Sequence, residues 1–168
     1  MEHLLIPQKR AELLDKKTLK KASEMLKCKI DVEGNEIMFE GAPYDEYNAK
    51  NILQAFGRGF ELGKAYKLLN DDYFFKQINL KDSYRNKDQM ARIKARIIGS
   101  DGKAKEYIES VSGVDMVVFG STISTIGKIN ELQAADAALR ILIGGGKHKT
   151  AYSAMELEKR KLKGKDYA

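Results

Sequence analysis

The chain has 168 residues, of which 43% are hydrophobic and 32% are charged, and this composition suits one globular domain or two small ones rather than a disordered protein. Its formal net charge of +6 and its pI near 9.2 are common in proteins that bind phosphate groups. A single cysteine, Cys28, excludes an internal disulfide framework, and the sequence shows neither a signal peptide nor an apolar run of the ~18 residues that a membrane helix needs. We therefore expect a cytoplasmic protein.

The first half opens with a lysine-rich segment, which is either a solvated helix face or a surface that attracts RNA. Its lysines are Lys16, Lys17, Lys20, Lys21, Lys27 and Lys29. Further on, residues 57–63 carry three glycines without the spacing of a dinucleotide-binding loop, so we expect a helix end followed by a short helix. The polar run Asn70-Asp71-Asp72 then interrupts two apolar stretches. This interruption predicts two domains, 1–70 and 71–168.

The second half alternates strand-like and helical patterns of apolar residues. Met90, Ile93 and Ile97 form one helical stripe, for example, and Gly120-Ser121 forms a turn between two apolar runs. In chain order, we expect a strand over 74–80, a loop over 82–87, two helices on either side of residues 99–102, strands over 115–119 and 122–126, a helix over 130–143, and a last helix over 150–163.

The segment Arg96-Ile-Ile-Gly-Ser-Asp-Gly-Lys103 joins the two central helices. We expect Gly99 to end the first helix, and the side chains of Ser100 and Asp101 to cap the second. Without side chains, Gly99 and Gly102 would let a phosphodiester backbone approach the positive end of that helix. A lone Gly-x-x-Gly is also an ordinary connection between helices, but the order of strand, helix, loop, helix, strand, strand and helix favours a nucleic-acid site.

This order, with Ile98-Gly-Ser-Asp-Gly-Lys103 at the helix junction, resembles a type I KH domain, whose glycine loop clamps about four nucleotides of single-stranded nucleic acid. The second half also looks like that of the ribosome-assembly KH proteins called "partner of Nob", and resembles archaeal members more than eukaryotic ones. Family members usually continue the loop with Thr-Arg, where this chain has Ala104 and Lys105. The likeness is carried by Arg96–Lys103, Tyr107-Ile-Glu109, Ser112-Gly113, Val118-Phe-Gly120, Ile126-Gly127, Gly145-Gly-Lys-His148, Tyr152 and Glu156.

The resemblance implies an α+β fold of two tandem type I KH-like domains. Each would be a three-stranded antiparallel sheet packed against helices, and a C-terminal helix would follow the second. It further implies a single-stranded RNA-binding protein that binds small-subunit, 16S-type ribosomal RNA near its 3′ end during ribosome assembly and rRNA processing. The partners implied are the PIN-domain rRNA nuclease that trims this end and the alpha subunit of translation initiation factor two.

In this interpretation, the glycine loop holds the RNA backbone, flanking basic residues contact phosphates, and the strand over 115–119 forms the floor of a groove for bases. The candidate RNA-binding residues are Arg92, Arg96, Ile98, Gly99, Ser100, Asp101, Gly102, Lys103, Lys105, Met116 and Val118. We expect that replacing both loop glycines with Asp would abolish RNA binding and leave the fold intact.

A shift of 86 residues aligns the two halves without a gap and predicts an internal duplication. It pairs Arg10 with Arg96, and the turn residue Gly34 with Gly120. The same shift places Leu13-Leu14-Asp15-Lys16 opposite the glycine loop. We therefore expect the first domain to lack a clamp, to bury the leucines at this position, and to serve as a packing or partner surface.

Searches for catalytic and cofactor motifs are negative. The run over 144–150 resembles a phosphate loop, but Ile141 stands where the first glycine is required. His3 and His148 lack the spacing of zinc ligands, and no carboxylate cluster indicates a two-metal nuclease. We therefore expect no enzymatic activity, no cofactor and no metal.

A second function class stays open at this point: a protein-interaction scaffold whose KH folds no longer bind RNA. Its motivation is Asp101, because an acid in this loop would face a phosphate. Such a scaffold would bind the nuclease or the initiation-factor subunit instead.

Overall fold

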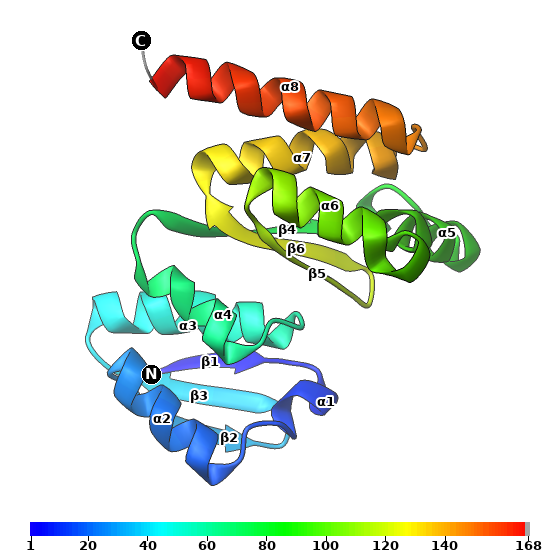
Figure 1. The fold of residues 1–168 in the computed structure, drawn as a ribbon. Helices are drawn as coiled ribbons and strands as arrows, with labels where there is room; N and C mark the ends of the chain where they lie inside the picture. Colours follow the sequence, from blue (N-terminus) through cyan, green and yellow to red (C-terminus); the bar gives the residue numbers. More distant parts are fainter. Residues whose placement is uncertain (167–168) are drawn as a thin grey trace. The chain divides into compact units, whose positions relative to one another are not determined.

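The computed structural model describes residues 1–166 and divides into two compact units (Figure 1). Unit 1 comprises Met1–Asp71, and unit 2 begins at Asp72. The division lies one residue from the boundary expected from the polar run. No helix within the described residues is long and apolar enough to cross a membrane.

Unit 1 contains a three-stranded antiparallel sheet in the order β1-β3-β2. Its central strand places Ile37 opposite both Leu4 of β1 and Val32 of β2. The elements are β1 (Glu2–Leu5), α1 (Gln8–Ala11), α2 (Lys16–Leu26), β2 (Lys29–Glu33), β3 (Glu36–Glu40), α3 (Pro43–Gly57), α4 (Leu62–Ala65) and the 3₁₀ turn η1 (Tyr66–Leu69).

Unit 2 repeats the same order of strands and helices, with a sheet of order β4-β6-β5. Here Ile123 lies opposite both Ile78 of β4 and Val118 of β5. The elements are β4 (Tyr73–Asn79), η2 (Leu80–Asp82), α5 (Lys87–Ile98), η3 (Ser100–Gly102), α6 (Lys103–Ser112), β5 (Asp115–Phe119), β6 (Thr122–Lys128), α7 (Ile129–Ile143) and α8 (His148–Asp166). The predicted fold class, two three-stranded antiparallel sheets with helices and a C-terminal helix, is confirmed.

Local chemistry accounts for several of these boundaries. The side chain of Asn86 begins α5 by accepting a hydrogen bond from the Asp88 amide at 2.7 Å. Glu131 begins α7 by accepting one from the Lys128 amide at 2.8 Å. The turn between β5 and β6 needs φ +56° at Gly120, and the corresponding turn of unit 1 needs φ +62° at Gly34. These are the glycines that the 86-residue shift pairs.

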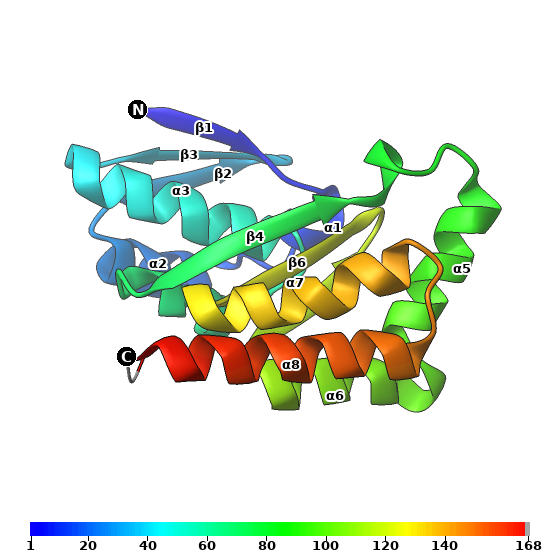
Figure 2. The ribbon, with the colours of Figure 1, turned by 90° about the horizontal axis from the view of Figure 1, so that it is seen from above.

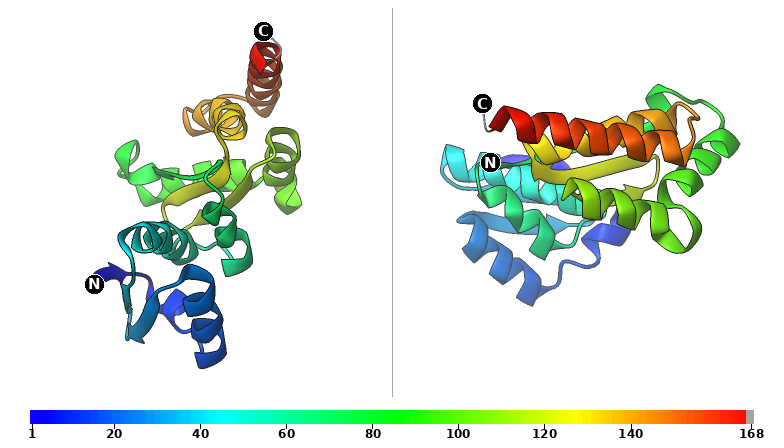
Figure 3. Two further views of the ribbon diagram at one scale, coloured as in Figure 1. Left: turned by 90° about the vertical axis from the view of Figure 1, so that its left-hand side faces the viewer. Right: turned by 45° about the horizontal axis from the view of Figure 1, so that its top comes forward.

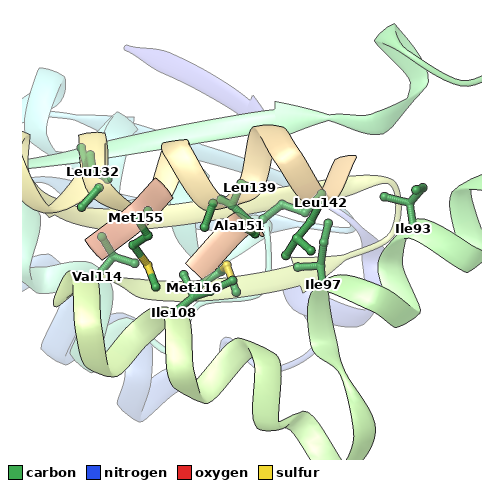
Figure 4. Packing of buried hydrophobic residues seen from close by; sticks show 14 of the residues in the cluster. Ile93, Ile97, Ile108, Val114, Met116, Leu132, Leu139, Leu142, Ala151 and Met155 are labelled. Carbon is green, nitrogen blue, oxygen red and sulfur yellow. The ribbon is translucent and has the colours of Figure 1, made fainter. Parts of the chain in front are cut away.

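The core of unit 2 lies between one face of the sheet and the helices α5, α6 and α7 (Figure 4). Met116 of β5, Ile97 of α5 and Ile108 of α6 are at most 1% exposed there. Burying a side chain of this size contributes roughly 1.5–3 kcal/mol. Ala151 and Met155 bring α8 into the same core. The fourth helix is therefore part of the folded unit.

Helix α8 forms an outer layer of unit 2. It runs beside α7 (Figure 2), and α7 lies between it and the sheet (left view of Figure 3). It also packs against α6.

The two units share the bounds of most elements after an 86-residue shift: β2 with β5, the start of β3 with that of β6, and α3 with α7. They differ at their beginning, since α1 has 4 residues and α5 has 12. The first strand, β1, was not located from the sequence, because its run of four residues is too short to stand out beside Pro7. The helix end at Gly57 and the short α4 lie where they were expected.

Candidate nucleic-acid interface

The loop between α5 and α6 has an unusual backbone. Three of its four residues have positive φ: Gly99 at +77°, Asp101 at +55° and Gly102 at +74°. Within it, the Gly102 amide donates to the carbonyl of Gly99 at 3.2 Å. Gly102 is the N-cap residue of α6, and no side chain caps that end. The first amides of α6 therefore lack a side-chain acceptor, which is the condition for binding an external anion.

The expectation that Ser100 and Asp101 cap α6 is wrong, because both precede the N-cap and neither accepts a capping bond. Both residues are exposed. Asp101 lies in the left-handed region, which Asp and Asn tolerate better than most residues.

The two glycines have different roles. A Cβ at Gly99 would lie 2.6 Å from Cβ of Ala104 and 2.8 Å from its backbone nitrogen. Gly99 therefore allows α6 to begin close against the end of α5. A Cβ at Gly102 would meet nothing within 4 Å, so this glycine keeps an open face. The expectation that both can become Asp with the fold intact is consequently wrong for Gly99.

The basic candidates separate into free and engaged side chains. Arg92 and Lys103 are exposed and make no hydrogen bond or ion pair with any residue that the structure describes. Lys105 instead pairs with Glu109, with Nζ and Oε1 2.7 Å apart. Arg96 is partly buried, and its guanidinium donates to the carbonyl of Gly146. In this structure, Arg92 and Lys103 are thus the cations available to a phosphate.

The apolar candidates separate in the same way. Ile98, at the end of α5, is 37% exposed, and Val118 of β5 is partly buried. Met116 is only 1% exposed and points into the core shown in Figure 4. A base cannot reach it, so the expected place of Met116 in the groove floor is corrected. Of the apolar candidates, Ile98 and Val118 are thus the two that keep exposed surface, although Val118 also packs against the core.

Side chains of α8 make hydrogen bonds and a ring contact with the two helices that flank the glycine loop. The His148 ring, through Nε2, lies 2.8 Å from the carbonyl of Arg96 and therefore donates to it. Tyr107 of α6 donates to Glu156 of α8, and its ring centroid lies 4.4 Å from that of Tyr152. The hydrogen bond to Glu156 is the main cause of a raised pKa at Tyr107. These residues fasten α8 to both helices that flank the loop.

The sequence alone predicts no role for His148, Tyr152 and Glu156. The arginine contacts did have a signal in the sequence, because the 86-residue shift pairs Arg10 with Arg96. Arg10 donates to the carbonyl of Phe60 at 2.7 Å, and Arg96 to that of Gly146, the residue 86 positions later. Each unit therefore contains the same contact, in which an arginine donates to a backbone carbonyl 50 residues later in the chain.

The corresponding helix junction of unit 1 is closed by its own residues. Asp15 is the N-cap of α2 and accepts a hydrogen bond from the Thr18 amide at 2.7 Å. This bonding to Thr18 is the main reason that the pKa of Asp15 is lowered, with a smaller contribution from Lys17. Leu14 is buried as expected, whereas Leu13 is 57% exposed, so the expectation that both leucines are buried is wrong. This junction has no open glycine.

The residues that the structure describes contain no group of three His, Cys, Asp or Glu side chains that could hold a metal ion.

A three-stranded antiparallel sheet, helices on one face and a glycine loop at the helix junction define a type I KH-domain protein. Residues 74–160 match the family model of the second KH domain of PNO1, described as "Eukaryotic type KH-domain (KH-domain type I)". The chain belongs to the Pno1 family.

Three known proteins illustrate this relationship. A KH domain-containing protein of Methanocaldococcus jannaschii is 33% identical over 97% of this chain and 76% of its own length. The pre-rRNA-processing protein pno1 of Aspergillus fumigatus is 31% identical over 57% of this chain, which spans 39% of that longer protein. A chain in the crystal structure of the a/eIF2alpha–aDim2p–rRNA complex of Pyrococcus horikoshii has a TM-score of 0.86 and 31% identity, covering 95% of this chain and 94% of its own.

Proposed function

We propose that this protein binds RNA in pre-rRNA processing and clamps a single-stranded segment at Gly99–Gly102. The observation that carries the proposal is the uncapped beginning of α6, whose amides face an open glycine loop beside the free cations Lys103 and Arg92. The family model and the name of the Aspergillus relative support it. The scaffold alternative is not favoured.

The geometry favours a phosphate above the loop. The helix macrodipole places about half a positive charge at the start of α6, and the backbone amides there can donate to phosphate oxygens. Lys103 adds a mobile charge, while Ile98 and Val118 offer apolar contacts to bases. A segment of four nucleotides that neutralises about three phosphates gives a log–log salt slope near −2. A slope of about −6 would mean that a broad basic surface makes most of the phosphate contacts and that the loop makes few of them.

The RNA we propose is the small-subunit rRNA near its 3′ end. The Pyrococcus complex contains rRNA and a/eIF2alpha together with aDim2p, and this supports RNA and the initiation-factor subunit as partners here. The PIN-domain nuclease is proposed from the family resemblance. In this proposal the protein acts in the cytoplasm, by binding and without catalysis of its own.

The test compares Gly102→Asp with Gly145→Asp in a filter-binding titration with a short RNA from the rRNA 3′ region. Both glycines have positive φ and open space where a Cβ would lie, so strain and added charge are matched. We expect Gly102→Asp to lose at least about tenfold in affinity, because each 1.4 kcal/mol of repulsion and steric exclusion is a factor of ten. We expect Gly145→Asp to bind like the unmodified protein. Equal affinities for two folded variants would exclude the clamp and favour the scaffold.

A further inference from the structure

Asp101 and Gly102 of the glycine loop form a chemically reactive pair. An aspartate followed by glycine is prone to rearrange, because the glycine amide nitrogen can attack the side-chain carboxyl and no side chain hinders its approach. Asp101 is the only aspartate or asparagine of the sequence that is followed by glycine. The one pair of this kind therefore lies in the loop that we assign to the RNA backbone.

The structure leaves both reacting groups of this pair accessible. Asp101 is exposed, and its carboxylate makes no hydrogen bond or ion pair within residues 1–166. A Cβ at Gly102 would meet nothing within 4 Å, so the approach to the amide nitrogen of this residue is open. That nitrogen donates a single hydrogen bond, to the carbonyl of Gly99 at 3.2 Å, which is the long end of the ordinary range.

The reaction requires a change in the backbone of the loop. Asp101 has φ +55° and ψ 26°, and it must rotate about ψ to bring the Gly102 nitrogen onto its own carboxyl carbon. This rotation breaks the hydrogen bond between Gly102 and Gly99. Exposed loops that few hydrogen bonds hold open at a low free energy. The free loop therefore reaches the reactive geometry, and any ligand that keeps the loop closed opposes the reaction.

The equivalent aspartate of unit 1 is protected. The 86-residue shift pairs Asp101 with Asp15 and Gly102 with Lys16. The carboxylate of Asp15 is the N-cap of α2 and accepts a hydrogen bond from the Thr18 amide at 2.7 Å. The residue that follows it is a lysine at the first position of α2, and its side chain hinders attack by its amide nitrogen. The chain therefore contains its own control for the reaction.

We propose that Asp101 is a site of spontaneous isoaspartate formation, and that this modification disables the clamp in protein that is not holding RNA. The inference rests on the proposed function, since it describes how the same site is lost and how its ligand protects it. In the first step, the Gly102 nitrogen bonds to Cγ of the protonated Asp101 carboxyl, and the carboxyl hydroxyl and the amide proton leave as water. Water then breaks the bond between that nitrogen and the backbone carbonyl carbon of the succinimide. The chain continues through Cγ, the former backbone carbonyl becomes a carboxylate, and nothing is oxidised or reduced.

An isoaspartate adds one atom to the main chain of a loop that has little room for it. The Gly99 end cannot shift, because a Cβ there would already lie 2.6 Å from Cβ of Ala104. The displacement therefore falls on Gly102 and on the first amides of α6, which the phosphate needs as donors. The new carboxylate is attached directly to the main chain and lies beside the place of the phosphate. Both changes lower the affinity for RNA.

The experiment incubates the full chain at mildly acidic pH, with and without a short single-stranded RNA from the rRNA 3′ region, and follows two tryptic peptides. Ile97–Lys103 contains Asp101, and Ala11–Lys16 contains Asp15. We expect the first peptide to split into two chromatographic peaks of equal mass and the second to stay single. The new peak should accept a methyl group from S-adenosylmethionine when an isoaspartyl methyltransferase is used as the probe. RNA at about ten times its Kd should slow the reaction about tenfold, because only free protein reacts.

Binding and two variants connect the modification to the clamp. Protein that an immobilised short RNA no longer retains should be enriched in the new peak, and its affinity should be at least about tenfold lower. Asp101→Asn forms the same succinimide by losing ammonia, so at neutral pH it should be modified faster than the unmodified protein. Asp101→Glu can close only a six-membered ring and should keep a single peak.

The failures of the two proposals can be told apart. Absence of the new peak after incubation without RNA would overturn this inference, because the folded loop would then prevent ring closure. Full RNA affinity of the isoaspartate form would overturn it as well, and so would equal rates with and without an RNA that the protein binds. In each of these cases the clamp itself stays in place. If freshly prepared protein fails to bind the short RNA at all, the clamp is refuted.

Discussion

The two helix junctions, 86 residues apart, differ in how the free backbone amides at the start of the following helix are treated. In unit 1, the carboxylate of Asp15 satisfies the Thr18 amide at the start of α2. In unit 2, the start of α6 has no side-chain cap and lies under an open glycine. Helix α2 is therefore capped by a carboxylate of the protein, whereas the start of α6 can accept an external anion.

This difference shows that the same fold can carry either a closed or an open helix junction. The sheets, the strand registers and the arginine contacts of Arg10 and Arg96 are shared by the two units. The junctions differ, and so does the helix that precedes each of them, with 4 residues in α1 and 12 in α5. Fold alone therefore does not assign RNA binding to unit 1, and the site must be judged from its own atoms.

The largest effect that would sharpen the comparison is expected from Gly99→Ala. The new Cβ would lie 2.6 Å from that of Ala104, and Gly99 has a φ of +77° with ψ 175°, a region open essentially only to glycine. We expect a loss of about 3 kcal/mol, measured as a shift in the urea midpoint. Gly102→Ala should cost about 1 kcal/mol. Leu13→Ala in unit 1 should cost under about 0.5 kcal/mol because that side chain is largely exposed.

The next effect concerns the shared arginines. We expect Arg10→Met and Arg96→Met each to destabilise the protein by about 1.5–3 kcal/mol, since Arg10 donates to the carbonyls of Phe56 and Phe60 and Arg96 to that of Gly146, and such bonds are charge-assisted. Affinity for a short RNA, measured well below the melting temperature, should change less for Arg96→Met than for Lys103→Gln. A stable Arg96→Met variant with much weaker RNA binding would show that Arg96 contacts phosphate after all.

These residues also show what the sequence could predict. The sequence predicts strand β5 and the last residue of α7 to the residue, because an apolar run between Gly113 and Gly120 marks the strand and Gly144 follows the helix. The glycine loop was found for the same reason, since its geometry requires specific residue types. The burial of Leu14 followed from its position opposite that loop.

What the sequence could not predict depends on contacts between distant residues. Met116 and Val118 look equivalent in an alternating strand, but only packing against α5 and α6 shows that Met116 is sealed in the core. Arg96 and Lys105 look like free cations, yet a carbonyl 50 residues away and a carboxylate one turn away engage them. Tertiary partners decide which charges remain available to a ligand.

A smaller effect is expected from Asp101→Asn. The residue does not cap α6, and Asn tolerates its left-handed backbone, so the melting temperature should stay nearly unchanged. Removing the charge beside the bound phosphate should tighten RNA binding severalfold at low salt, with the gain shrinking as salt is added. Unaltered RNA affinity together with weaker binding to a protein partner would mean that the loop faces protein.

The smallest effect is the pH dependence expected from Asp15 in unit 1. The pKa of Asp15 is lowered in the folded protein, so its capping contributes stability above the ordinary pKa of Asp and loses it as pH falls through the lowered value. The Thr18 amide resonance should therefore titrate with a midpoint below about 3.9, the ordinary value for Asp. Asp15→Asn should remove this titration. A midpoint at or above the ordinary value would mean that the hydrogen bond contributes little.

The unequal beginnings of the two units bear on how the chain folds. Tandem copies of one topology can exchange equivalent strands while they fold, and the first copy is available earlier during synthesis. Here β1 has 4 residues and reaches α1 through Ile6 and Pro7 alone, whereas β4 has 7 residues and is followed by a longer connection to α5. A β1 strand paired with β6 in place of β4 would leave part of β6 unpaired, since β1 has 4 residues and β4 pairs with 7 residues of β6. We expect this difference in strand length to favour the pairing of each sheet with its own first strand.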